Sequence, residues 1–192
     1  MITLRKYQTE AIASIYDHFN TQSGSPLVVL PTGTGKSLVI AEFLRGAIEA
    51  FPKTRMMMLT HVKELIEQNL DELIGLWPEA PVGIYSAGIG QKDTHAQITF
   101  GGVQSVARGL SRFKRAPDLI LIDEAHVTPR RTESQYGKVI EHFKAMNPDM
   151  KLIGLTATPY RLDSGRLDKG EGRLFDSICY EADVGAMIDE GF

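Results

Sequence analysis

The segment LVVLPTGTGKS at residues 27–37 restricts the possible folds of this chain more than any other part of the sequence. An apolar run that leads into a glycine-containing loop and then an amphipathic stretch is typical of a strand, a phosphate-binding turn and a helix. Gly33 and Gly35 allow the backbone amides to turn toward phosphate oxygens. Lys36 carries a positive charge for the outer phosphates, and the hydroxyl of Ser37 is suited to Mg²⁺. We therefore expect a nucleoside triphosphate and Mg²⁺ at one loop, formed by Pro31, Thr32, Gly33, Thr34, Gly35, Lys36 and Ser37.

A second chemical signal is the segment DLILIDEAH at residues 118–126, an apolar run that ends in two acids. A phosphate-binding loop needs a further metal ligand at the tip of a neighbouring strand, and Asp123 is placed to supply it. Glu124 is placed to orient and deprotonate an attacking water molecule. A lone histidine is more often a packing or hydrogen-bonding residue, yet this position joins the candidate catalytic residues, which are Lys36, Asp123, Glu124 and His126.

A third signal is LTATP at residues 155–159, where two hydroxyl groups flank a small residue at the expected end of a strand. Ligands of parallel sheets gather at this end of the strands. We expect Thr156 and Thr158 to hydrogen-bond the acids of the Asp123 loop and so to relay the state of the nucleotide.

Composition narrows the class of protein. The chain has 192 residues, of which 43% are hydrophobic and 23% are charged, and it carries one cysteine. These values are typical of one globular domain and exclude disordered, collagen-like and coiled-coil chains. One thiol closes no internal disulfide, no apolar run reaches the roughly 18 residues of a membrane span, and the N-terminus lacks a signal-peptide core. We expect a cytoplasmic protein with no membrane partner.

Short apolar runs alternate with amphipathic stretches along the chain, which is typical of parallel βα units and an α/β fold. An exposed loop is expected at residues 161–176, where charges of both signs are mixed with glycines. Strands are expected at residues 27–30, 55–60, 82–85, 97–100, 118–122, 151–155 and 178–181, and helices at residues 4–20, 62–77, 134–146 and 184–190 and directly after the glycine-containing loop.

Together these segments resemble the first motor domain of superfamily 2 helicases and translocases, with matching blocks in the same order. The blocks are LRKYQTEAI at 4–12, PTGTGKS at 31–37, LTHVKELIEQN at 59–69, ITFGGVQSVA at 98–107, DEAH at 123–126 and TATP at 156–159. The amino-acid sequences of these blocks are similar to those of bacterial and phage RadD-type DNA repair helicases. The resemblance implies that residues 1–192 form a RecA-like P-loop NTPase domain. Its central sheet would have about six or seven mostly parallel strands with helices on both faces.

The resemblance also implies roles for residues outside the phosphate loop. Gln8 would read the adenine edge of ATP, with Arg5 and Tyr7 beside the base. A basic rim would continue the contact with nucleic acid along residues 108–115, although a solvated basic face is the alternative because the net charge is −3. The nucleic acid would be DNA by preference, in single-stranded or branched form. Its strand would make contacts, mainly through its phosphates, with His61, Lys63, Gly102, Gln104, Ser105 and Arg108.

The implied function is the ATPase half of an ATP-dependent DNA helicase or translocase, of repair or restriction type. A second RecA-like domain, absent from this chain, would complete the site with a cation, so little activity is expected of the chain alone. Two alternatives stay open. One is a P-loop kinase that acts on a small acceptor and uses Arg161, Arg166 and Arg173 as a lid; the other is a nucleotide-dependent binding module without turnover. The pair Asp123 and Glu124 suits the activation of water and favours the hydrolase.

Overall fold

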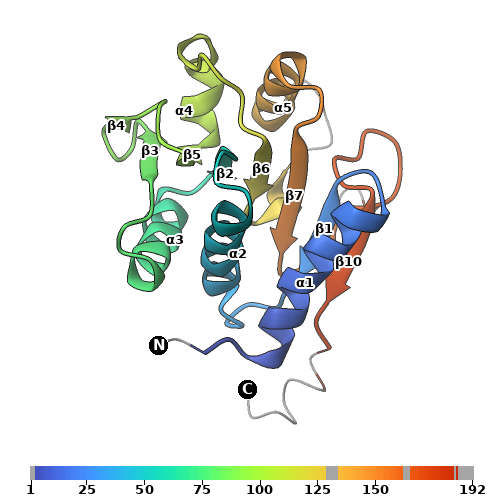
Figure 1. Cartoon of the computed structure of the whole chain (residues 1–192). Coiled ribbons are helices and arrows are strands. Elements are labelled where there is room, and N and C mark those ends of the chain that lie inside the picture. The colour runs from blue at the N-terminus through green and yellow to red at the C-terminus, as the bar shows by residue number, and fades with distance from the viewer. Residues whose placement is uncertain (1–2, 129–133, 162–164, 184, 186–192) are drawn as a thin grey trace.

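The computed structural model describes residues 3–128, 134–161, 165–183 and 185. The main-sheet strands within these residues are β1 (Pro26–Val29), β2 (Met56–Thr60), β3 (Val82–Ser86), β4 (Gln91–Lys92), β5 (Ile98–Gly102), β6 (Leu119–Ile122), β7 (Lys151–Thr156) and β10 (Ser177–Glu181). They form one sheet in the order β10-β1-β7-β6-β2-β5-β3-β4 (Figure 1). All paired neighbours are parallel except β3 and β4. The α/β class and the mostly parallel sheet are confirmed.

Helices cover both faces of the sheet. One face packs against α1 (Lys6–Thr21), α2 (Lys36–Ala50) and α3 (Lys63–Leu76), which Figure 1 shows in a row. The other face packs against α4 (Val103–Arg108) and α5 (Gln135–Met146). Single turns of 3₁₀ helix lie at η1 (Leu110–Arg112) and η2 (Ala125–Val127). No helix among the described residues is long and apolar enough to cross a membrane.

Strand β2 shows how the sequence supplies two hydrophobic cores at once. Met56 and Met58 point into the core under α1–α3, whereas Met57 and Leu59 point into the core under α4 and α5. Side chains alternate between the faces of a strand, so a strand covered on both faces must be apolar at every position. The run of three methionines is therefore core material.

The sheet brings the chemical segments of the sequence to one edge. The residues that follow β1, β2, β6 and β7 are the glycine-containing loop, the segment that begins at His61, the acidic pair and the threonine segment. Parallel neighbours end at the same edge, and ligands of such sheets bind there.

The strand count differs from the expectation in one respect. The main sheet has eight strands among the described residues, because β4 adds a two-residue antiparallel partner to β3. A strand of two residues is too short to produce a hydrophobic period in the sequence.

The expected exposed loop at residues 161–176 is exposed at most of its described residues, but the expectation is wrong for one short strand and three buried side chains. Its described part contains β9 (Gly165–Arg166), which pairs with β8 (Tyr160–Arg161). Leu167, Asp168 and Phe175 are buried. A Cβ atom placed on Gly154 of the central strand β7 would lie 2.5 Å from Cε1 of Phe175, so the aromatic ring packs directly on the sheet. The helix expected at residues 184–190 lies outside the described residues.

Candidate nucleotide site and strand groove

The glycine-containing loop joins β1 to α2, and its backbone takes a conformation that needs glycine. Gly33 and Gly35 have φ values of 85° and 74°, in the left-handed region that residues with a Cβ atom seldom adopt. Helix α2 begins at Lys36 directly after this turn. The loop therefore presents the N-terminus of a 15-residue helix, with its free backbone N–H groups, as an anion site.

The start of α1 braces this loop. Thr34 accepts two hydrogen bonds on its carbonyl oxygen, from the hydroxyl of Tyr7 at 2.9 Å and from Nε2 of Gln8 at 3.0 Å. Oε1 of Gln8 accepts from the backbone N–H of Arg5 at 2.9 Å. The structure thus places Gln8 against the phosphate loop, 4% exposed, and its role in reading adenine stays a prediction.

Asp123 lies at the end of β6 with both carboxylate oxygens bonded. Oδ1 accepts from the backbone N–H of Glu124 at 2.9 Å, and Oδ2 accepts from Nδ2 of Asn69 at 2.9 Å. Burial is the largest influence on this carboxyl group and raises its pKa, while the bond from Asn69 acts in the opposite direction. A buried carboxylate whose charge is incompletely compensated is suited to a cation.

Glu124 has φ 51° and ψ 50°, and it is the one non-glycine residue with positive φ in the described part of the chain. This left-handed conformation costs roughly 1–2 kcal/mol for a residue with a side chain. Such strain is retained mostly at functional sites, where the surrounding structure enforces it. The backbone conformation of Glu124 directs its carboxylate toward the glycine-containing loop.

Four side chains form a continuous polar chain across the edge of the sheet. Nζ of Lys36 lies 2.9 Å from Oε1 of Glu124, and Oε2 of Glu124 lies 3.3 Å from Nδ1 of His126. That ring nitrogen is also 3.0 Å from Oγ1 of Thr156. The chain runs from the phosphate loop through the acidic pair to the end of β7, and the strand order places these three elements next to each other.

The expected contact between the threonines and the acids takes a different form. Oγ1 of Thr156 bonds His126 and donates to the backbone carbonyl of Thr158 at 2.9 Å, and it makes no hydrogen bond to Asp123 or Glu124 among the described residues. The histidine intervenes because it follows Glu124 on η2, which packs beside β7. His126, which the sequence analysis includes among the candidate catalytic residues, is the actual link.

The candidate Mg²⁺ ligands fit this ion by donor chemistry. Ser37 supplies a hydroxyl oxygen and Asp123 a carboxylate oxygen, and Mg²⁺ in phosphate sites takes one or two such ligands together with phosphates and waters. Among the described residues no group of three His, Cys, Asp or Glu side chains converges as a complete metal cage. The arrangement suits an ion that arrives with a nucleotide.

A groove of about 160 Å³ lies at the same edge of the sheet, beyond β2 and β5. Ser86 contributes to it from the end of β3, and Gly88 from the β3–β4 connection. The hydroxyl of Ser105 is held by the backbone N–H of Ala87 at 2.9 Å. The structure brings together most of the predicted strand-contacting residues here, namely His61, Lys63, Gly102, Gln104 and Ser105.

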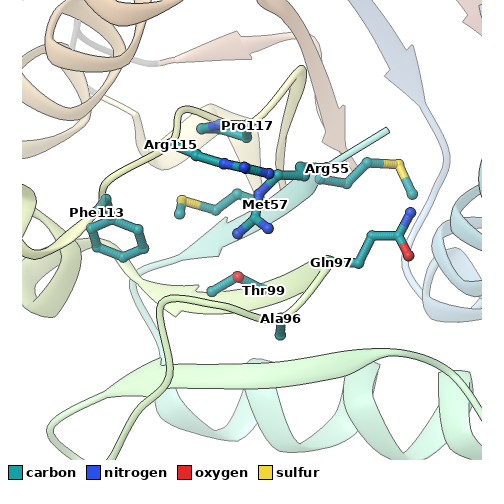
Figure 2. Close-up of a pocket in the computed structure, with 9 residues that line it drawn as sticks. Arg55, Met57, Ala96, Gln97, Thr99, Phe113, Arg115 and Pro117 are labelled. Atoms are coloured by element: carbon teal, nitrogen blue, oxygen red, sulfur yellow. The ribbon is translucent and has the colours of Figure 1, made fainter. Parts of the chain in front are cut away.

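The predicted basic rim at residues 108–115 does not form one continuous edge. Arg108 lies at the end of α4, outside the groove lining. Arg115 lines a different, smaller cavity with Arg55 and Gln97, where β2 and β5 begin (Figure 2). Because parallel strands place their beginnings and ends at opposite edges, Arg115 is separated from the groove by the length of the strands.

A family model described as "Type III restriction enzyme, res subunit" matches residues 1–161. The chain belongs to this family. Irc3 of Schizosaccharomyces pombe, named as a mitochondrial ATP-dependent helicase, is 28% identical over 197 residues, which cover 100% of this chain and 31% of irc3. This chain therefore spans about a third of the length of that relative.

Solved helicase structures share the fold of this chain. The UvsW helicase of bacteriophage T4 superimposes with a TM-score of 0.68 at 20% identity, covering 93% of this chain and 60% of UvsW. The helicase domain of Pyrococcus furiosus Hef gives 0.67 at 21% identity, covering 99% and 41%. The fold is that of the N-terminal RecA-like domain of superfamily 2 helicases. The finer likeness to RadD-type helicases stays a prediction.

Sequence reasoning missed two residues of the candidate nucleotide site. Asn69 and Gln68 of α3 contact Asp123 and Ser37, at 2.9 and 3.3 Å. A signal for Asn69 was present, because it shares the buried face of α3 with apolar residues, and a polar residue at such a position needs a polar partner.

Proposed function

We propose that this chain is the ATP-binding motor domain of an ATP-dependent DNA helicase or translocase, and that it uses Mg²⁺. The observation that carries the proposal is the polar chain from Lys36 through Glu124 and His126 to Thr156. It joins the phosphate loop to the end of the neighbouring strand. Membership of the res-subunit family and the helicase names of its relatives support the same function.

Lys36 and Glu124 of the polar chain have defined tasks in ATP hydrolysis. Lys36 binds the outer phosphates, which requires its ion pair with Glu124 to open. Glu124 is then free to hold a water molecule and take its proton as the water oxygen bonds to the γ-phosphorus. The bond from that phosphorus to the β–γ bridging oxygen breaks, and ADP and phosphate leave. Mg²⁺, held by Ser37 and Asp123, would offset the negative charge of the phosphates.

The polar chain also provides a route by which hydrolysis moves other parts of the protein. When Glu124 leaves Lys36, its other oxygen still faces His126, whose ring bonds Thr156. A change at the γ-phosphate therefore reaches the end of β7. In the complete protein, we infer, a second RecA-like domain packs against this edge and contributes a cation to the transition state.

The kinase alternative is disfavoured by the positions of the arginines that would form its lid. Arg161 donates to the backbone carbonyl of Thr128 at 2.8 Å. Arg166 makes two hydrogen bonds to the carboxylate of Asp168, at 2.9 and 3.1 Å. These guanidinium groups hold the β8–β9 hairpin and its flanks in place, so they are engaged in local structure.

An ATPase assay with and without single-stranded DNA tests the proposal. We expect slow or no turnover by this chain, and DNA-stimulated turnover by a longer protein that includes a second RecA-like domain, since a cation supplied in trans contributes about 10³–10⁵ in rate. Glu124→Gln should bind ATP and fail to hydrolyse it. Equal turnover by the short chain that ignores DNA would reject the motor, and release of ADP only with a small acceptor would favour the kinase. Binding without turnover in the longer protein would favour the non-catalytic module.

A further inference from the structure

Helix α3 carries two consecutive amide side chains that reach the two candidate Mg²⁺ ligands. Nε2 of Gln68 donates to Oγ of Ser37 at 3.3 Å. Nδ2 of Asn69 donates to Oδ2 of Asp123 at 2.9 Å. Ser37 belongs to α2 and Asp123 follows β6, so one helix contacts both ligands although they come from separate elements.

The amide of Asn69 is held in one orientation. Its Nδ2 donates to the carbonyl oxygen of Leu65 at 2.8 Å as well as to Asp123, which uses both N–H bonds. A flipped amide would place Oδ1 against two acceptors and would be repelled. The side chain is 0% exposed, and Oδ1 has no hydrogen-bond partner among the described residues.

That unpartnered oxygen is informative because Asn69 shares the buried face of α3 with Ile66 and Leu73. A buried carbonyl oxygen without a donor is unfavourable, so an apolar residue would pack better at this position. The asparagine is explained by what its N–H groups do, and one of them holds Asp123.

The first turn of the same helix forms a wall of the strand groove. Lys63 and Ile66 line the groove together with Gly102. A Cβ atom on Gly102 would lie 3.7 Å from Cδ1 of Ile66, and one on Gly88 would lie 3.6 Å from Cδ of Lys63. Asn69 is six residues beyond Lys63, which is about 9 Å along a helix. The phosphate backbone of a nucleic-acid strand bound in the groove would therefore contact α3, the helix whose Asn69 hydrogen-bonds Asp123.

We propose that Asn69 is a positioning residue, assisted by Gln68, which sets the geometry of the Mg²⁺ ligands and links it to the strand bound at the first turn of α3. The inference rests on the proposed function, because it assigns the metal to Ser37 and Asp123. Oδ1 of Asp123 is already held by the backbone N–H of Glu124, so Asn69 decides the direction of the remaining oxygen. Loss of a residue that orients a metal ligand typically weakens metal binding by about 10–100-fold.

The test measures binding of a fluorescent N-methylanthraniloyl ATP analogue to this chain during a titration with MgCl₂. For Asn69→Ala we expect the Mg²⁺ concentration at half-maximal response to rise about tenfold, while binding of the analogue without Mg²⁺ stays unchanged. Gln68→Ala should shift in the same direction by less, because Gln68 is exposed and its contact with Ser37 is longer. Gln68→Ala also keeps the test valid if the buried variant fails to fold.

Asn147→Ala is the matched control. Nδ2 of Asn147 also donates to a carbonyl and a carboxylate, those of Pro117 and Asp118, both at 3.3 Å, but next to the beginning of β6. Its Mg²⁺ response should equal that of the wild type. A wild-type response in folded Asn69→Ala, or an equal loss of binding with and without Mg²⁺, would overturn the positioning role. A wild-type chain that binds the analogue without any Mg²⁺ dependence would instead overturn the proposed function, and the inference with it.

A second arm adds a 20-residue oligo(dT) strand and repeats the titration. In the wild type the strand should lower the Mg²⁺ concentration required by about fivefold or more, which is the lower range of measured coupling between sites. The effect should be lost in Asn69→Ala and retained in Asn147→Ala. An equal effect of the strand in wild type and Asn69→Ala, or none in the wild type, would overturn the link between the groove and the metal site.

Discussion

Nζ of Lys36 and Oε1 of Glu124 lie 2.9 Å apart, and their side chains are only 12% and 22% exposed. The residue that would bind phosphate and the residue that would activate water are thus each other's partners. On the roles proposed above, a nucleotide would take Lys36 away from Glu124, so that binding would release the base. The ion pair would keep the base occupied until phosphates are in place.

Removal of Lys36 should affect both binding and stability. Lys36→Ala leaves the Glu124 carboxylate with His126 as its remaining ion-pair partner among the described residues. We therefore expect loss of nucleotide binding and a fall of about 1–3 kcal/mol in the free energy of unfolding. Urea denaturation measures the fall, and Glu124→Gln added to Lys36→Ala should recover most of it. Lys6→Ala removes an exposed ion pair with Glu10, at 3.9 Å, and should cost about 0–1 kcal/mol. Equal costs for the two lysine variants would contradict the buried pair.

The backbone of the phosphate loop predicts a graded response at two glycines. Gly35 and Gly165 both have φ +74°, but a Cβ atom on Gly35 would lie 2.7 Å from Nε2 of Gln8, whereas one on Gly165 would meet no atom of the described residues within 4 Å. Both alanine variants should lose about 1–2 kcal/mol to backbone strain. Gly35→Ala should lose about 1 kcal/mol more, because Gln8 must leave the carbonyl of Thr34. Thermal unfolding of the two variants measures this difference. An equal loss of stability in both would show that the Gln8 side chain moves aside without measurable cost.

Asp123 should be a position where function opposes stability. Burial raises its pKa above the ordinary value, so the folded state gains stability from the protonated form below about pH 3.9 and loses it as the pH rises through the folded-state pKa. Asp123→Asn should therefore raise the melting temperature at pH 7, with a smaller gain near pH 4, and abolish the Mg²⁺ dependence of nucleotide binding. A variant that is less stable at pH 7 would show that the bonds from Asn69 and Glu124 outweigh the cost of burial.

The segment at residues 165–176 should be part of the folded core. Phe175 is 2% exposed and packs on Gly154, so Phe175→Ala should cost about 3–5 kcal/mol in urea denaturation. Glu171→Ala, an exposed change in the same segment, should stay within about 0.5 kcal/mol. A cost of less than about 1 kcal/mol for Phe175→Ala would indicate that the segment is a loop whose packing does not stabilise the sheet.

The parts of the site that could be predicted from the sequence depend on neighbouring residues. The turn at Gly33 and Gly35, the helix that begins at Lys36 and the apolar strand that ends at Asp123 all follow from local spacing and period. The burial of Phe175 could not be predicted in this way. Its partner Gly154 lies 21 positions away on another strand, and the glycines and charges around Phe175 hide its apolar signal.

The α/β domain, its phosphate-binding loop and its acidic pair can be predicted from the residue order, because each depends on a short run of residues. Which of those side chains meet depends on the folded arrangement of the sheet and its helices. In the structure His126 lies between Glu124 and Thr156, and Asn69 hydrogen-bonds Asp123. Arg115 lies at the edge of the sheet opposite the groove. The physical reason is that such contacts depend on strand order and on which face a helix buries. Both are set by packing across the whole sheet, which no local pattern encodes.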